Sequence, residues 1–274
     1  MNASNITRRA TIGGATAGVG LAAVAFGNIA GVAHAQGEKK TFVLVHGTFG
    51  GGWCWRRVSD LLERDGHKVF SPTLTGLGER SHLVSKEINL DTHITNIVNV
   101  FKWEDLSNVC LVVHSYGGWI GSGVVEQVGG LISSIVWLDA FKPEDGQRPV
   151  DDLAPSLFRE IVLSAWEKGE PTFAAQLPLP KEVLVNENDR AYVESKLTPH
   201  PTGTYFQPIQ LKGAREKVQK KTYIRATKFR LPDFDKAFAE CKADKSWKTY
   251  EKDCYHIVML DEPHWLADTL VHSA

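Results

Sequence analysis

A serine follows a hydrophobic run and precedes two glycines in the segment Val-His-Ser-Tyr-Gly-Gly (113–118). The run is typical of a buried strand, and the glycines open a segment with helical spacing. A sharp turn between a strand and a helix lifts a serine hydroxyl clear of the sheet, and the amino end of the helix favours negative charge beside it. This pattern predicts that Ser115 is a nucleophile for acyl transfer. Val113 stands where such turns usually carry their first glycine, so the motif departs from its common form.

A second glycine-rich segment, His-Gly-Thr-Phe-Gly-Gly-Gly (46–52), follows the first predicted strand. Parallel strands end at one edge of a sheet, so the amides of this segment emerge at the same edge as Ser115. Two main-chain N–H groups aimed at one oxygen stabilise the negative charge that develops during acyl transfer. We therefore predict an oxyanion hole formed by the amides of Thr48 and Tyr116. A phosphate-binding loop is the alternative, but neither of its glycine signatures occurs.

Two histidines close to the C-terminus could act as the general base. His256 lies on a short loop after the last predicted strand, whereas His264 lies one residue inside the helix that Pro263 begins. A side chain on a loop is freer to reach a serine at a neighbouring strand end, so we expect His256 to be the base. His114, directly before Ser115, is expected to pack beneath the turn.

The carboxylate that would orient the imidazole of His256 can be placed in two ways. Asp139 ends the predicted strand that follows the nucleophile helix. Asp233 and Asp235 come after the next strand, whose own end, in segment 223–232, carries no carboxylate. A carboxylate beside the imidazole accepts its N–H, fixes its tautomer and stabilises its charged form. We prefer Asp139, and Asp233 or Asp235 stay open as alternatives.

Six short apolar runs alternate with stretches of helical spacing, and this alternation is typical of parallel strands joined by helices. The sequence therefore predicts an α/β fold with a doubly wound, mostly parallel sheet. The predicted strands are 41–45, 68–71, 109–113, 135–139, 222–226 and 247–251, and the predicted helices include 53–64, 91–103 and 115–128.

The stretch from about 142 to 213 breaks this alternation, because prolines separate several short helical pieces between two core strands. We predict that it is an inserted helical cap over the carboxyl ends of the strands. Ligand crevices of open α/β sheets lie at those ends.

The first 35 residues differ from the rest of the chain. Arg8 and Arg9 precede an apolar run rich in glycine and alanine, and Ala-His-Ala (33–35) is a small-x-small triplet. This order predicts a cleavable export signal of the twin-arginine type, followed by a hydrolase domain over 36–274 in the periplasm or outside the cell. An uncleaved membrane anchor is the alternative that the length permits.

The composition excludes several classes of partner. The chain has 274 residues and a net charge of −1, which favours neither nucleic acid nor an anionic membrane. No clustered Cys or His spacing indicates a metal, and only Cys241 and Cys254 are plausible disulfide partners. We expect a small-molecule substrate, no cofactor, no metal and no stable membrane association after the signal is removed. Nothing in the sequence predicts an oligomeric state.

Four segments together resemble the α/β-hydrolase family, and within it the bacterial relatives of the plant methyl-esterase and hydroxynitrile-lyase group. They are Leu-Val-His-Gly-Thr-Phe-Gly-Gly-Gly-Trp-Cys-Trp (44–55), Thr-Leu-Thr-Gly-Leu-Gly-Glu-Arg (73–80), His-Ser-Tyr-Gly-Gly (114–118) and His-Ile-Val-Met-Leu-Asp-Glu-Pro (256–263).

The resemblance implies hydrolysis of an ester, thioester, amide or carbamate without a cofactor. Family members commonly place the triad aspartate after the penultimate strand, whereas some, including haloalkane dehalogenases, place it where Asp139 stands. A hydroxynitrile lyase would carry a lysine at Ile257, so that activity is discounted. A cofactor-free perhydrolase shares the same triad and stays open.

Aromatic residues flank the predicted site, and we expect Phe49, Trp119 and Trp166 to line a substrate pocket. The expected substrate is a small, uncharged, hydrophobic or aromatic carboxylic ester, with an amide or carbamate as the second choice. A ligand-binding homologue that has lost catalysis is the non-enzyme alternative, because of Val113 and the displaced acid. Further aromatics in the predicted cap and its flanks are Phe158, Phe173, Tyr205 and Phe206.

Overall fold

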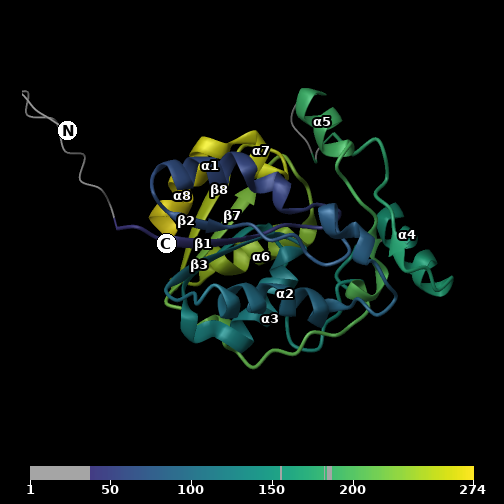
Figure 1. Cartoon of the computed structure of the whole chain (residues 1–274), viewed down its shortest axis with the longest axis horizontal. Helices are drawn as coiled ribbons and strands as arrows, with labels where there is room; N and C mark the ends of the chain where they lie inside the picture. The colour runs from purple at the N-terminus through teal and green to yellow at the C-terminus, as the bar shows by residue number, and fades with distance from the viewer. Residues whose placement is uncertain (1–37, 155, 182, 184–186) are drawn as a thin grey trace, which may run out of the picture. The chain divides into compact units, whose positions relative to one another are not determined.

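Six parallel strands form the central sheet in the order β2-β1-β3-β4-β7-β8 (Figure 1). The computed structural model describes residues 38–154, 156–181, 183 and 187–274, so the predicted export signal lies outside the described residues. All six predicted strands are observed, and the prediction of a mostly parallel sheet is confirmed. They are β1 (Thr41–Val45), β2 (Lys68–Phe70), β3 (Val109–Ser115), β4 (Ile132–Ala140), β7 (Lys220–Ala226) and β8 (Trp247–Lys252).

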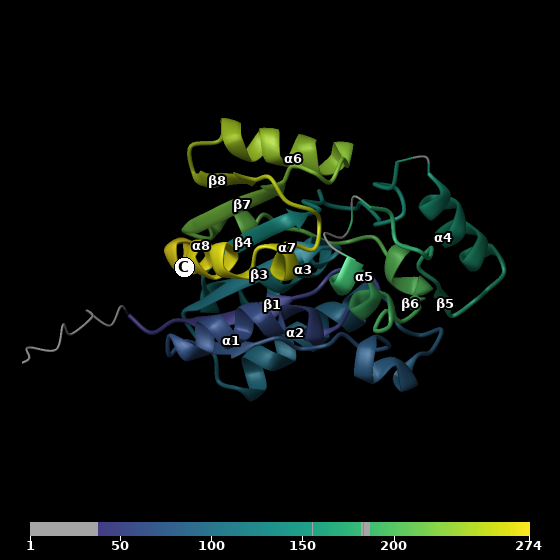
Figure 2. The same ribbon diagram turned by 90° about the horizontal axis from the view of Figure 1, so that it is seen from above.

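Helices cover both faces of the sheet, as Figures 1 and 2 show. Because successive side chains of a strand point to opposite faces, each strand serves two hydrophobic clusters. In β1, Phe42 and Leu44 belong to the cluster shared with α1 and α8, and Val43 and Val45 belong to the cluster shared with α2 and α3. The helices are α1 (Arg56–Arg64), α2 (Leu90–Trp103), α3 (Gly117–Val128), α6 (Pro232–Ala243), α7 (Val258–Asp261) and α8 (Pro263–Ser273).

Three helix starts differ from the prediction. The chain from Gly52 to Trp55 is a 3₁₀ turn, so α1 begins at Arg56 rather than at residue 53. The helix expected from residue 91 begins at Leu90, because Asn89 caps α2: its side chain accepts the N–H of Thr92, whose hydroxyl in turn accepts the Asn89 N–H. This reciprocal pair satisfies two amides that a helix start leaves free. Ser115 is the last residue of β3 and α3 begins at Gly117, because the turn at the serine must be completed before helical backbone can start.

The chain between β4 and β7 leaves the sheet and returns to it. In its described residues it contains two helices and a two-stranded antiparallel ribbon, which lie beyond the carboxyl ends of the strands (Figure 2). We call residues 141–219 the excursion. Its helices and strands are α4 (Leu157–Glu167), β5 (Thr172–Phe173), α5 (Glu187–Glu194) and β6 (His200–Pro201).

Two further features bear on location and redox state. Among the described residues, no helix combines the length and the apolar character needed to span a bilayer. Cys241 and Cys254, the pair considered for a disulfide, are both buried free thiols in the structure.

Candidate active site

Ser115 lies in a strained turn that only small neighbours permit. Its φ is 56°, in the left-handed region that non-glycine residues rarely adopt. A Cβ on Gly47 would lie 2.8 Å from the Cβ of Ser115, and a Cβ on Gly118 would lie 1.9 Å from the carbonyl oxygen of Phe141. Both glycines are therefore required for the turn to pack against its surroundings.

The packing around Val113 explains why the common first glycine is dispensable here. The strand end and the following helix must approach closely, which usually calls for a glycine on the strand. In this chain the glycine is on the helix: a Cβ on Gly121 would lie 2.5 Å from Cγ1 of Val113. The side chain of Val113 therefore occupies the space that Gly121 leaves on the helix, and the strand and the helix can still approach closely.

Three of the predicted site residues form one hydrogen-bonded line. His256 Nε2 lies 2.9 Å from Ser115 Oγ, and His256 Nδ1 lies 2.7 Å from Oδ2 of Asp139. A carboxylate only accepts, so Nδ1–H donates to Asp139 and Nε2 is left to accept the serine proton. This is the arrangement that a general base needs to activate a hydroxyl.

The alternative residues lie elsewhere. Asp235 forms an ion pair with Arg225, and Asp233 lies in the first turn of α6, where burial raises the pKa of its carboxyl. His264 is an exposed residue of α8. Of the three carboxylates considered, the structure brings Asp139 against His256.

Asp139 is fully buried, and both of its oxygens are occupied. Oδ2 faces His256, while Oδ1 accepts hydrogen bonds from Arg225 (2.5 Å) and from the N–H of Ala226 (3.1 Å). Burial alone would lower the pKa of the Arg225 guanidinium, but the carboxylates of Asp139 and Asp235 outweigh it and raise that pKa. The arginine is therefore a permanent cation beside the acid.

Packing fixes the imidazole of His256. It stacks against the rings of Phe229 and Phe234, with centroids at 4.3 and 5.7 Å, and these two rings contact each other at 6.0 Å. His114, expected beneath the turn, lies at 4.5 Å beside the imidazole, and its Nε2–H donates to the carbonyl of His256 (2.9 Å). Burial, and then the neighbouring His256, hold the pKa of His114 well below its usual value, so His114 stays neutral.

His46 shapes the loop that carries Thr48. Its Nε2 accepts the N–H of Leu74 (3.1 Å), so Nδ1–H donates to the carbonyl of Gly47 (2.8 Å). The C=O and N–H of a trans peptide point in opposite directions, so the N–H of Thr48 is turned away from His46. Burial lowers the pKa of His46 to about 4, which keeps this pattern intact at neutral pH.

The excursion also holds this loop. Phe49 has a φ of 65°, its N–H donates to Nδ1 of His200 (3.4 Å), and its carbonyl accepts the N–H of Thr198 (3.2 Å). The hydroxyl of Thr48 lies 2.7 Å from the hydroxyl of Tyr205. Residues far along the chain therefore determine the shape of the predicted oxyanion loop.

A cavity of about 410 Å³ opens at Ser115 and His256. Its wall is mostly apolar, and Thr48 and Phe49 of the glycine-rich loop contribute to it. The other aromatic residues in the wall are Trp53, Phe141, Phe158, Tyr205, Phe229 and Phe234.

Two predicted pocket residues do not line this cavity. Trp119 is 1% exposed and packs in the core, with its ring 6.4 Å from that of Phe141, because its face of α3 turns toward the sheet. Trp166 is 51% exposed and stacks on Phe206 at 4.1 Å, on the outer side of α4. Proximity in sequence to the motifs did not determine which face of each helix these side chains occupy.

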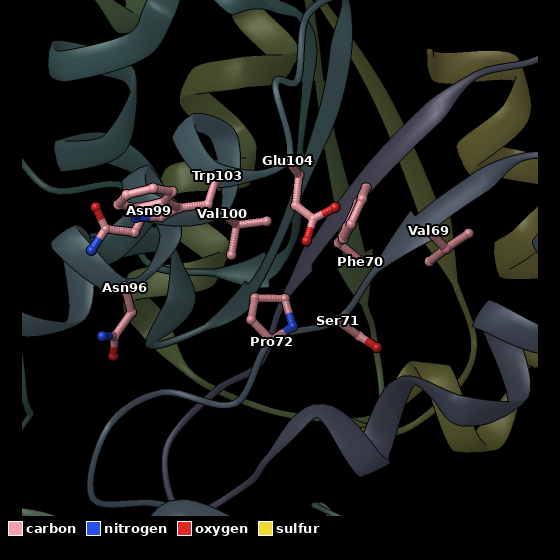
Figure 3. A pocket seen from close by; sticks show the side chains of 9 residues that line it. All are labelled: Val69, Phe70, Ser71, Pro72, Asn96, Asn99, Val100, Trp103 and Glu104. Carbon is pink, nitrogen blue, oxygen red and sulfur yellow. The ribbon is translucent and has the colours of Figure 1, made fainter.

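A second hollow, of about 480 Å³, lies between β2 and the end of α2 (Figure 3). Figure 3 shows apolar and amide side chains around it, the hydroxyl of Ser71, and Glu104 as the ionisable residue. Because no histidine lies in this hollow to activate the hydroxyl of Ser71, it does not compete as an active site. In the described part of the chain, no group of His, Cys, Asp and Glu side chains could hold a metal ion.

Sequence reasoning missed Arg225 and His200. A charged residue inside the apolar strand Thr-Tyr-Ile-Arg-Ala (222–226) does signal a buried partner, since an unpaired buried charge is too costly. No comparable signal marks His200, because its contacts depend on how the excursion folds.

Comparisons with known proteins identify the family of this chain. The model of the Alpha/beta hydrolase family matches residues 42–269. The chain is 37% identical over 238 residues to a carbendazim hydrolyzing esterase of Nocardioides sp. (strain SG-4G), a match that covers 84% of this chain and 97% of that protein. It is 28% identical over 200 residues to putative methylesterase 11, chloroplastic, of Arabidopsis thaliana, and that match covers 68% of this chain and 51% of the plant protein.

Among solved structures, an extracellular α/β-hydrolase from a Paenibacillus species superposes with a TM-score of 0.76 at 23% identity, covering 86% of this chain and 99% of that one. The chain therefore belongs to the α/β-hydrolase family. It is an enzyme, a hydrolase of the esterase type.

Proposed function

We propose that the protein is a serine hydrolase that cleaves a small, uncharged, hydrophobic or aromatic carboxylic ester. Ser115 attacks the substrate carbonyl while His256 takes the hydroxyl proton, and Asp139 holds the imidazole and stabilises its charged form. The amides of Thr48 and Tyr116 donate hydrogen bonds to the oxyanion. His256 then protonates the leaving group, and water hydrolyses the acyl-enzyme by the same route, which regenerates Ser115.

The observation that carries this proposal is the 2.9 Å contact between Ser115 Oγ and His256 Nε2 in the wall of an apolar cavity. A serine hydroxyl becomes a nucleophile when a neutral base accepts its proton. A ligand-binding homologue without catalysis would not need the serine, the imidazole and a buried carboxylate to be aligned. The glycine at 121 also removes the crowding that made Val113 an argument for that alternative.

The cavity supports a small apolar substrate. A volume of about 410 Å³ lies in the range of small-molecule sites, and aromatic rings favour a flat or aromatic group. A carbamate is the second candidate, because the 37% identical relative is named for the hydrolysis of carbendazim, a carbamate. An amide is the third.

Hydrolysis of a matched panel tests the proposal. The panel holds aromatic and short-chain p-nitrophenyl esters, the corresponding N-methylcarbamates and the corresponding anilides. We expect the aromatic esters to have the highest kcat/KM, and Ser115→Ala or His256→Ala to lower it by about a thousandfold or more. Ser122→Ala is the matched control, since its buried hydroxyl bonds only the carbonyl of Gly118 (2.8 Å) in α3.

Two outcomes would count against the proposal. Full activity in Ser115→Ala would show that Ser115 is not the nucleophile. A preference for long-chain triglycerides or charged peptides would contradict the substrate class.

We also propose that residues 1–35 direct export by the twin-arginine route and are then removed. The paired arginines, the apolar run and the Ala-His-Ala triplet support this. In a bacterial host we expect the periplasmic protein to begin near Gln36, and replacement of Arg8 and Arg9 by lysine to retain the precursor in the cytoplasm. A periplasmic protein that keeps residues well upstream of Gln36 would contradict removal.

A further inference from the structure

The acid side of the site continues beyond Asp139 to the buried guanidinium of Arg225 and then to the half-exposed carboxylate of Asp235. The guanidinium of Arg225 lies 2.5 Å from Oδ1 of Asp139, and its Nε donates to Asp235 (2.9 Å). The side chain is only 3% exposed. We propose that Arg225 is a positioning residue that fixes the Asp139 carboxylate toward His256 and, together with Asp235, sets the pH range in which His256 acts as base. This inference rests on the proposed function.

The hydrogen bonds divide the two oxygens of Asp139 between two tasks. Arg225 and the N–H of Ala226 hold Oδ1 from β7, so Oδ2 alone faces His256. A carboxylate held by two donors cannot rotate without losing both. The imidazole therefore meets its acceptor in one orientation.

Arg225 is itself rigidly held, which makes it suitable for this role. Its guanidinium also donates to the carbonyls of Ala226 (2.6 Å) and Phe229 (2.5 Å). Phe229 is the residue whose ring stacks on His256. The same arginine thus anchors the acid on one side of the imidazole and the backbone of the aromatic wall on another.

The charge of Arg225 acts on the proton that Asp139 and His256 share. Closely coupled groups titrate as a pair, and catalysis requires that the pair has lost its last proton. That state is a carboxylate beside a neutral imidazole, with one negative charge. A buried cation stabilises this charged state electrostatically.

Charged and titratable groups from every side of His256 have to be considered. Asp139 and Arg225 dominate because both are buried, whereas Asp235 is 54% exposed and is screened by water. His114 is neutral. The groups around the imidazole are His114 of β3, Asp139 of β4, Arg225 of β7, Arg230 of the cavity wall, Asp235 of α6 and Asp261, which accepts the N–H of Tyr255 (2.9 Å).

The pH dependence of kcat/KM for a neutral ester tests the proposal. In Arg225→Met the pair holds its last proton more tightly, so the acid limb should move up by about one pH unit, and the plateau should fall. In Asp235→Asn the arginine is less compensated, so the limb should move down by a smaller amount. Arg225→Lys keeps the positive charge but loses the planar set of N–H donors. Its acid limb should therefore stay near that of the wild type, while kcat falls.

Arg56→Met is the matched control, because Arg56 forms an exposed ion pair with Asp60 on α1 (2.8 Å) and should leave the profile unchanged. If Arg225 had a purely structural role, its replacement would lower the amount of active enzyme without moving the acid limb of the pH profile. Unmoved limbs in both Arg225→Met and Asp235→Asn would overturn the inference while the proposed function stands. If Arg225→Met does not fold, Asp235→Asn tests the inference by itself: a downward shift of its acid limb supports the inference, and an unmoved limb overturns it. A wild-type protein inactive on every ester would overturn both.

Discussion

Ser115 and Asp139 share an uncommon backbone conformation, with φ values of 56° and 44°. A non-glycine residue in this region costs of the order of 1–3 kcal/mol and persists only where its surroundings enforce it. Ser115 is the last residue of β3 and Asp139 the last but one of the adjacent strand β4, and the pairing of the two strands is irregular at this point. Both residues whose side chains meet His256 are therefore strained, as is Phe49 of the glycine-rich loop (φ 65°).

The contact between Val113 and Gly121 yields a prediction on stability. Gly121→Ala should destabilise the protein by about 1–3 kcal/mol, because the new methyl group would overlap Cγ1 of Val113. Val113→Gly should also destabilise it, through the space it leaves. In the double variant the methyl group fills that space, so the combined loss should be clearly smaller than the sum. Chemical denaturation of the four proteins measures this coupling.

Gly130→Ala provides the control for that cycle, since a Cβ there meets nothing within 4 Å and should change stability little. Additive losses at positions 113 and 121 would show that the helix does not replace the missing strand glycine.

At this scale the sequence was informative wherever a residue followed a strand in a recognisable segment. Ser115 and His256 were predicted in this way, and Asp139 was preferred because segment 223–232 has no carboxylate. The role of Arg225 could not be predicted, because it depends on which neighbour the strand order places beside β7. Trp119 and Trp166 were misplaced because their exposure depends on packing that no local pattern encodes.

Among the elements, the excursion has the closest connection to the reaction. His200 accepts the N–H of Phe49, while Thr198 donates to the carbonyl of the same residue. Nε2–H of His200 donates to the hydroxyl of Thr204 (3.0 Å), which leaves Nδ1 free to accept. Burial keeps the pKa of His200 well below its usual value, so this acceptor persists at working pH.

Two substitutions of His200 should test its two hydrogen bonds one at a time, the bond to the N–H of Phe49 and the bond to the hydroxyl of Thr204. His200→Asn keeps an acceptor near the position of Nδ1, and its kcat should stay within about threefold of the wild type. His200→Gln keeps only a group near Nε2, so the loop at Thr48 should loosen and kcat should fall by about tenfold to a hundredfold with little change in KM. Steady-state kinetics on one ester measures both values.

The melting temperatures of the two variants supply the control. Each variant loses one hydrogen bond of the same buried ring, so both should be destabilised to a similar extent. Equal kcat values for His200→Asn and His200→Gln would be inconsistent with a role for the Phe49 contact.

The elements of the core were predictable because parallel strands buried on both faces read as short apolar runs. The predicted start of α2, residue 91, is one residue late, since Asn89 and Asp91 are both good capping types and only the backbone distinguishes them. The internal structure of the excursion was not predictable, because its short pieces are held by contacts with the glycine-rich loop rather than by their own periodicity.

For the molecule as a whole, the stability should depend on pH in part through Asp152, a residue of the excursion. Burial, and then repulsion from Asp233 of α6, raise the pKa of Asp152 to about 6. The folded protein therefore binds this proton more tightly than the unfolded chain does. Its contribution to stability is present at low pH and is lost as the pH rises from about 4 to about 6.

Asp152→Asn should remove that loss. We expect it to raise the melting temperature at pH 7.5 and to leave it nearly unchanged at pH 4, as differential scanning calorimetry would record. Asp151→Asn is the neighbouring control with the opposite sign, because hydrogen bonds from Arg148 lower the pKa of Asp151. A lower melting temperature for Asp152→Asn at pH 7.5 would contradict the expected sign.

The most direct measurement is the reaction of the mature protein with a fluorophosphonate, followed by intact mass and peptide mapping. We predict one covalent adduct per chain, located on Ser115, with labelling slowed by orders of magnitude in His256→Ala and no adduct in Ser115→Ala. An unlabelled protein, or an adduct on any other residue, would show that Ser115 is not the activated nucleophile.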